Sequence, residues 1–207
     1  MATVTERLFH LIAAVLLVLA VAGCATTADR KVTLLYEPTV HATGGSGELY
    51  LAKEAESPPS GANQAVQWVI GSIKDRDGNK TGSIVTDTMP VDLVLQAFSA
   101  ELKAAGYTVV PVSDVPPKAV KGISLGNAVI TLDEVASLVK VEAKSSVKVS
   151  AEIWRDGSRV TRLTYETVNS DMTVTGRDQF LRETLGKALQ NLMREAVPAL
   201  IKVLEQK

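Results

Sequence analysis

Apolar residues recur along the chain with two spacings, one typical of strands and one typical of helices. Alternating or continuous apolar runs predict β-strands at residues 31–36, 48–53, 67–74, 81–86, 107–112, 128–139, 143–155 and 159–168. Helical spacing predicts one helix that begins near Pro90 and a second over residues 177–205. This order predicts an α+β fold with a curved, mainly antiparallel sheet. We expect two main helices on one face of the sheet, the second long and C-terminal.

The strand predicted at residues 143–155 shows the clearest alternation. Polar residues alternate there with apolar ones, which we expect to face the core: Val147, Val149, Ala151 and Ile153. Period two over this length is typical of an antiparallel sheet with one face in water. Two Asp-Gly pairs, Asp77-Gly78 and Asp156-Gly157, stand between strand-like runs and predict hairpin turns.

The two predicted helices carry their own end signals. Asp87 or Thr88 is expected to cap the first helix, Pro90 suits its first turn, and Gly106 should end it. The second helix has an apolar stripe at helical spacing, made of Leu181, Leu185, Ala188, Leu192, Ala196 and Leu200. Pro198 lies inside this helix and is expected to kink it.

The N-terminal segment has the pattern of an export signal. Its apolar run, residues 11–22, is shorter than the roughly 18 residues that a membrane-spanning helix needs. Val21, Ala22 and Gly23 precede Cys24, the only cysteine of the chain, and this motif resembles the bacterial lipobox. We therefore expect residues 1–23 to be a lipoprotein signal peptide that is cleaved before Cys24. Val21, Ala22 and Gly23 would be recognised by the signal peptidase, and Cys24 would carry the lipid.

The residues after the cysteine bear on the location of the protein. Residues 24–31 would form a lipid-anchored tether, and residues 32–207 a single α+β domain. Residues 25–31 reach about 25 Å when fully extended, so the domain would lie near the bilayer surface. Ala25 stands where an aspartate would signal retention in the inner membrane. The lipoprotein sorting rule therefore favours the outer membrane, with the domain facing the periplasm of a Gram-negative bacterium.

Composition excludes several classes of function. The chain has 207 residues, a net charge of −1 and 4% aromatic residues. A chain with so little net charge and so few stacking side chains does not match a nucleic-acid-binding protein. A single cysteine excludes an internal disulfide and a multi-cysteine metal site. We find no Walker loop and no dinucleotide fingerprint, so we expect no cofactor.

Three weak chemical signals fail when their context is considered. Residues 122–126 match G-x-S-x-G, but no histidine follows residue 41 to act as the base for Ser124. His41, in a glycine-rich stretch, has no companion ligands at a metal-site spacing. The acidic turn around Gly78 resembles a calcium loop, but Ile73 and Ile84 would occupy ligand positions. We therefore expect no metal site and no enzymatic activity.

Trp68 and Trp154 lie in predicted strands. Packing in the core or on a sheet face is the simpler interpretation, and an exposed binding face is the alternative. The second helix also leaves open whether its apolar side chains pack in the core or bind a partner. The side of this helix that carries Phe180, Leu189 and Met193 could dock a partner helix.

Several motifs together carry a resemblance to a family. The lipobox, the opening Val32, Leu34 and Tyr36, the segment 69–92 and the helix that ends at residues 101–106 occur in the same order as in YajG-type uncharacterised lipoproteins. The resemblance implies an outer-membrane lipoprotein without assigned catalytic residues. That family also resembles auxiliary lipoproteins of ABC-type transport systems for lipids and solvents.

Two functional hypotheses follow. The first is a non-enzymatic structural or interaction module, attached to the membrane by the lipid on Cys24 and meeting an envelope protein partner. The second is a transport accessory that binds an apolar ligand between sheet and helices. A pocket lined by Val, Leu and Ile would favour the second hypothesis, and a fully packed core would count against it.

Overall fold

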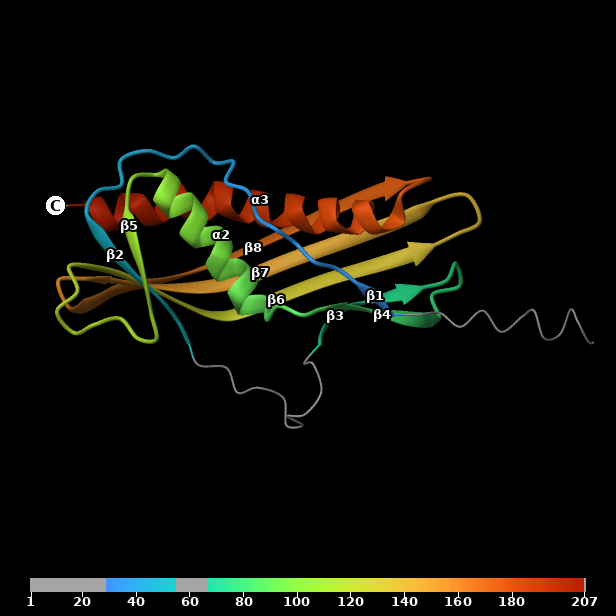
Figure 1. Ribbon diagram of the computed structural model, residues 1–207, viewed down its shortest axis with the longest axis horizontal. Coiled ribbons are helices and arrows are strands. Elements are labelled where there is room, and N and C mark those ends of the chain that lie inside the picture. The colour runs from blue at the N-terminus through green and yellow to red at the C-terminus, as the bar shows by residue number, and fades with distance from the viewer. Residues whose placement is uncertain (1–28, 55–66, 207) are drawn as a thin grey trace, which may run out of the picture.

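The computed structural model describes residues 29–54 and 67–206 (Figure 1). Eight strands and two helices lie in these ranges, in the order β1 (Arg30–Lys31), β2 (Glu48–Lys53), β3 (Trp68–Lys74), β4 (Lys80–Thr86), α2 (Pro90–Ala104), β5 (Thr108–Val112), β6 (Lys121–Ala136), β7 (Val141–Arg155), β8 (Ser158–Thr173) and α3 (Arg177–Glu205). The strands form one sheet. This arrangement confirms the predicted α+β fold, with a curved sheet and a long C-terminal helix.

Strand β6 organises the sheet. One of its edges pairs with β7 along almost its whole length, and β7 pairs in turn with β8, both in antiparallel fashion. The other edge pairs in parallel with β2 near Gly122 and with β3 near Glu134. The remaining strands extend these two arms, because β5 pairs with β2, β4 with β3 and β1 with β4. The long ladders are antiparallel, and the short arms add parallel pairings that strand spacing alone did not indicate.

The two helices cover the sheet from one side. Helix α3 packs on β7 and β8, and α2 packs on β6 and contacts α3 (Figure 1). The core-facing positions predicted for β7 are fully buried: Val147, Val149, Ala151 and Ile153. The predicted stripe of α3 is also fully buried: Leu181, Leu185, Ala188, Leu192, Ala196 and Leu200. Phe180, Leu189 and Met193 are buried as well, so this side of α3 belongs to the core and does not dock a partner helix.

The strand predicted at residues 31–36 is largely wrong. Strand β1 contains only Arg30 and Lys31, and one further backbone bond joins Val32 N to Val85 O at 2.8 Å. The chain then leaves the sheet edge and crosses α3 and α2 (Figure 1). Apolar side chains of this segment pack against the hydrophobic core although the segment has no partner strand: Leu34, Tyr36, Val40 and Ala42. We call residues 33–46 the strap.

Several boundaries also differ from the prediction: β6 ends at Ala136 instead of residue 139, and β8 extends to Thr173 instead of residue 168. Met89, not Asp87 or Thr88, is the N-cap of α2, and no side chain caps this helix end. The hydroxyl of Thr86 instead accepts a hydrogen bond from Thr88 N at 3.3 Å. Strand β6 begins at Lys121 rather than at residue 128, because a bulge at Asn127 (φ 50°) lets the ladder continue through the glycine-rich segment.

Both predicted Asp-Gly hairpins are confirmed. Asp156 and Gly157 have φ angles of 50° and 75°, the left-handed conformations that a tight two-residue turn requires. In the other hairpin, the Asp75 carboxylate accepts hydrogen bonds from the backbone of Asp77 and Asn79. Hydrogen bonds from Asn79 hold the pKa of Asp75 below its usual value. The Asp75 carboxylate thus bonds to the backbone of its own turn. Ile73 and Ile84, which would occupy ligand positions in a calcium loop, lie in strands β3 and β4.

Candidate functional site

The predicted lipid-attachment residues Val21, Ala22, Gly23 and Cys24 lie outside the described residues. The structure instead describes where the chain enters the domain, at Asp29, Arg30 and Lys31. The Asp29 carboxylate accepts a hydrogen bond from Ser83 N at 2.8 Å, and Lys31 forms an ion pair with Asp87. The entry point is therefore fixed on both sides of Arg30: Asp29 holds it to β4, and Lys31 holds it to Asp87, the residue after β4.

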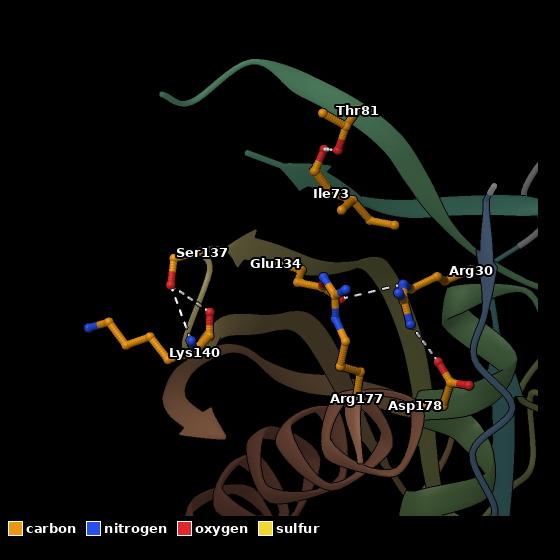
Figure 2. Close-up of polar contacts among 8 residues, drawn as sticks. All are labelled: Arg30, Ile73, Thr81, Glu134, Ser137, Lys140, Arg177 and Asp178. Atoms are coloured by element: carbon orange, nitrogen blue, oxygen red, sulfur yellow. Dashed lines mark hydrogen bonds and ion pairs between the residues drawn. The ribbon is translucent and has the colours of Figure 1, made fainter. Parts of the chain in front are cut away.

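Arg30 also takes part in a charged cluster that joins three parts of the fold (Figure 2). Its Nη1 donates to Asp178 Oδ1 at 2.7 Å, and its Nε lies 3.7 Å from Glu134 Oε2. Arg177 donates to the other oxygen of Glu134. The cluster thus links the entry segment, the end of β6 and the first turn of α3. We call these four residues the entry cluster.

Glu134 is the buried member of the entry cluster. Its side chain is 0% exposed, whereas that of Arg177 is 38% exposed and that of Arg30 26%. Taking a carboxylate out of water is costly, and the two guanidinium groups offset part of that cost. Glu134 Oε2 and Arg177 Nε are buried without a hydrogen-bond partner. Asp178 lies in the first turn of α3, where a negative charge is favourable to the helix dipole.

A hollow of about 680 Å³ lies beside the entry cluster. Its lining is mostly charged or polar and consists of Asp29, Arg30, Lys31, Ile73, Lys74, Asp75, Thr81, Ala136, Arg177 and Asp178. Both positive and negative side chains line it, and Arg30 and Asp178 form an ion pair there. This lining does not suit an apolar ligand.

The strap is held by a second buried carboxylate, Glu101 of α2, which is 1% exposed. Glu101 accepts hydrogen bonds from Tyr36 Oη at 2.6 Å, Thr39 N at 2.7 Å and Val40 N at 3.2 Å. Burial, reinforced by the bond to Glu101, raises the pKa of Tyr36 well above its usual value. The carboxylate satisfies two backbone groups of a segment that has no partner strand, so the strap is fixed on α2.

A third carboxylate, Glu205, accepts hydrogen bonds at the C-terminal end of α3. It accepts hydrogen bonds from Tyr107 Oη at 2.7 Å and Lys121 Nζ at 2.6 Å. Partial burial alone would raise the pKa of Glu205, but the bonds from Lys121 and Tyr107 outweigh it and lower the pKa. Burial and the bond to Glu205 raise the pKa of Tyr107. These contacts join α3 to the starts of β5 and β6.

The space between sheet and helices is filled in the described part of the chain. Leu125, Val149 and Leu189 are each 0% exposed and belong to one continuous apolar core. A hollow of about 560 Å³ lies between the strap and α3, with Leu34, Leu35 and Tyr36 beside charged residues such as Arg182 and Lys187. It is a surface groove of mixed character, not a pocket that enters the core.

A group of exposed apolar side chains lies at the end of the sheet where β6 turns into β7. We call it the apolar tip: Val135, Leu138, Val139, Met172 and Val174, which are 37%, 98%, 80%, 64% and 77% exposed. Val135 and Met172 are the cross-strand partners of Glu142 in the neighbouring strands. All three lie on the face of the sheet that the helices do not cover. Hollows of about 590 Å³ and 380 Å³ adjoin these residues.

The structure shows where the weak catalytic and metal-binding motifs of the sequence lie. Residues 122–126 lie inside β6, with Ser124 paired to Glu152, rather than at the strand-to-helix turn that a nucleophile elbow needs. His41 is exposed in the strap and adopts a φ of 52°. Within residues 29–54 and 67–206, no three His, Cys, Asp or Glu side chains are grouped so as to hold a metal ion.

Trp154 packs on the sheet as the simpler interpretation expected. It pairs with Gly122 across the ladder, and its Nε1 atom is buried without a hydrogen-bond partner. Trp68 begins β3 and is half-buried. Neither belongs to the apolar tip.

No helix in the described ranges is both long and apolar enough to cross a bilayer.

Comparisons with known proteins show the fold. No protein-family model and no curated protein matches the chain. Among solved structures, protein XCC0632 from Xanthomonas campestris, of the family DUF330, superposes with a TM-score of 0.50 at 14% identity, over 83% of this chain and 94% of that one. A putative neuraminyllactose-binding hemagglutinin homolog from Helicobacter pylori aligns with a TM-score of 0.39 at 15% identity, over 84% and 96%. The chain thus shares its fold with a bacterial protein of the family DUF330.

Proposed function

We propose that the protein is a lipid-anchored outer-membrane lipoprotein whose α+β domain is a non-enzymatic structural or interaction module facing the periplasm. The observation that carries this proposal is the leader that ends in Val21-Ala22-Gly23-Cys24, with the only cysteine of the chain at the position where lipid is attached. Assignment to the YajG-type lipoproteins is part of the proposal and is supported by the order of the motifs.

The entry cluster supports this function mechanically. A tethered domain transmits any pull on its anchor through the first residues of the fold. Here those residues are joined to β4 by Asp29 and to β6 and α3 by Arg30. Two or more acyl chains on Cys24 would hold the protein stably, since each buried methylene contributes about 0.8 kcal/mol. The tether then keeps the domain near the bilayer and raises its effective concentration for an envelope partner.

The alternative, a transport accessory with an apolar ligand between sheet and helices, is less well supported. The described core is closely packed, and the hollows at the surface are lined by charged as well as apolar side chains. We therefore favour the interaction module.

Cell fractionation tests the proposal. Cys24→Ser should move the protein from the membrane fraction to the fraction of unanchored proteins without changing its folding. Ala25→Asp should move the lipidated protein from the outer to the inner membrane in a host that follows the enteric sorting rule, while the matched control Ala25→Ser should not. Retention of Cys24→Ser in the outer membrane would contradict the proposed anchor.

A further inference from the structure

The apolar tip is built on an unusual turn. Ser137 N donates to Lys140 O at 2.9 Å, and the Ser137 hydroxyl both donates to Lys140 O at 2.8 Å and accepts from Lys140 N at 3.2 Å. These bonds close the β6–β7 hairpin around Leu138 and Val139. Both apolar side chains are therefore held outward at the end of the longest ladders in the fold.

The other hairpins show that a tight turn in this chain does not require apolar residues such as Leu138 and Val139. The chain uses Asp-Gly pairs between β3 and β4 and between β7 and β8, which is the usual chemistry of tight turns. Leu138 and Val139 gain nothing from burial in the folded domain, because they are 98% and 80% exposed. Covering a side chain of this kind is favourable, because it removes apolar surface from water. The tip thus gains free energy only when another apolar phase or surface covers it.

The position of the tip indicates what covers it. In Figure 1, β1 and the β6–β7 loop lie at the same end of the molecule. The hollow of about 680 Å³ is lined both by Asp29 and by Ala136, the residue before Ser137. Asp29 is only five positions after Cys24 in the sequence, and a chain of that length can span at most about 18 Å. A lipid on Cys24 therefore lies close to the end of the domain that carries the tip.

We propose that the apolar tip inserts into the surface of the bilayer to which Cys24 is anchored. This inference rests on the proposed function, because the nearby lipid is what selects a bilayer as the occupant. Five side chains are few beside the 20–30 residues that each partner contributes to a stable protein interface. A bilayer needs no such area, because the lipid on Cys24 would already hold its surface beside the tip at a high effective concentration.

The charges around the tip set the character of this contact. Lys140 pairs with Glu142 at 2.5 Å, and Lys74 lies 3.7 Å from Asp133. Lysine and arginine side chains at this end, including Arg76 and Lys144, can extend toward headgroups while their stems lie on apolar surface. Because the neighbouring acidic residues balance them, insertion depends on the apolar side chains and should differ little between neutral and anionic membranes.

Two attachments, the lipid and the tip, fix the orientation of the domain. Strand β6 has 16 residues and is therefore roughly 50 Å long. Its other end begins next to Val120, which is 60% exposed. The tip would lie in the membrane interface, and Val120 would lie on the side of the domain away from the membrane. The surface presented to partners would include that far end.

Tryptophan quenching tests the proposal on the full mature chain. Leu138→Trp and the matched control Val120→Trp are each tethered through Cys24 to phosphatidylcholine vesicles that contain lipids brominated in the acyl chain. Native acylation supplies the tether, and if Cys24 carries a free thiol, that thiol is coupled to a maleimide-bearing lipid. The unsubstituted protein gives the background from Trp68 and Trp154.

We expect the added emission of Leu138→Trp to shift to shorter wavelength and to be largely lost to bromine, whereas that of Val120→Trp is unchanged. Equal emission on brominated and ordinary vesicles for Leu138→Trp would overturn the proposal. A shift to shorter wavelength without quenching would also overturn it and would indicate a second copy or a protein partner as the occupant. A free Cys24 thiol would contradict the proposed function alone, because the chemically tethered protein still tests the tip.

Discussion

Glu134 of β6 and Arg177 of α3 form an ion pair in which the carboxylate is completely buried. The pair joins the C-terminal half of the central strand to the first residue of the long helix. Arg30 approaches the same carboxylate from the entry segment. One side chain in the sheet thus holds together the start of the domain and the start of its final helix.

Loss of the Glu134 charge should destabilise the domain. Glu134→Gln keeps the shape of the side chain but removes the charge that Arg30 and Arg177 share. Because both guanidinium groups stay partly exposed to water, the free energy of unfolding should fall by about 1.5–3 kcal/mol, the contribution of a hydrogen bond to a charged group. Glu142→Gln is the matched control, because its ion pair with Lys140 is about half exposed and should contribute at most about 1 kcal/mol. Urea denaturation measures both, and equal small losses would show that the entry cluster contributes little.

The hydrogen bond between Tyr36 and Glu101 should hold the strap. Tyr36→Phe removes a bond to a buried carboxylate and should lower the free energy of unfolding by about 1.5–3 kcal/mol. Glu101→Gln should additionally speed proteolysis within residues 33–46. The exposed Glu183→Gln, on the surface of α3, should change stability by less than about 0.5 kcal/mol. An unchanged cleavage rate in Glu101→Gln would mean that apolar packing alone fixes the strap.

The buried tyrosines predict a loss of stability at alkaline pH. Burial, with a smaller contribution from Glu195, raises the pKa of Tyr165 to about 12. Burial also raises the pKa values of Tyr36 and Tyr107. Because these phenols ionise near pH 10 in the unfolded chain, their contribution is complete below pH 10 and is lost as pH rises toward the folded pKa. Denaturation midpoints should therefore fall above pH 10.

An ultraviolet titration provides the direct check of these pKa values. The absorbance change of phenolate formation should come at higher pH in the native protein than in the denatured protein. If the native and denatured curves coincide near pH 10, the tyrosines are not perturbed.

The apolar tip should be dispensable for folding. Leu138→Ser with Val139→Ser replaces exposed side chains and should change the free energy of unfolding by less than about 0.5 kcal/mol. Leu132→Ser, six residues earlier and 0% exposed, should cost more than about 2 kcal/mol. A large loss of stability in the tip variant would mean that Leu138 and Val139 serve the fold itself.

The sequence predicted the long elements well because their patterns are local. The helix over residues 177–205 and the inward row of β7 follow from side-chain period alone, and both are confirmed. The segment at residues 31–36 also alternates, but the same period suits a strand and an extended chain packed on helices. The two cases differ only in whether a neighbouring strand pairs with the segment beyond Lys31. Whether such a strand is present depends on how the rest of the sheet is arranged.

The entry cluster was missed for a related reason. Glu134 follows Ile130 and Leu132 at alternating positions, so a charge at a core-facing position was a visible signal. Glu101 likewise falls on the buried face of α2, next to Leu102 and three residues after Phe98. The partners of both carboxylates come from distant parts of the chain, and spacing within one element does not reveal them.

The central claim is that Cys24 carries the lipid that holds this domain at the membrane. The most direct test is the mass of the N-terminal peptide of the mature protein purified from membranes. The account predicts a chain that begins at Cys24 and carries a diacylglyceryl group on its sulfur. A mature chain whose Cys24 thiol is free, or one that still contains residues 1–23, would contradict it.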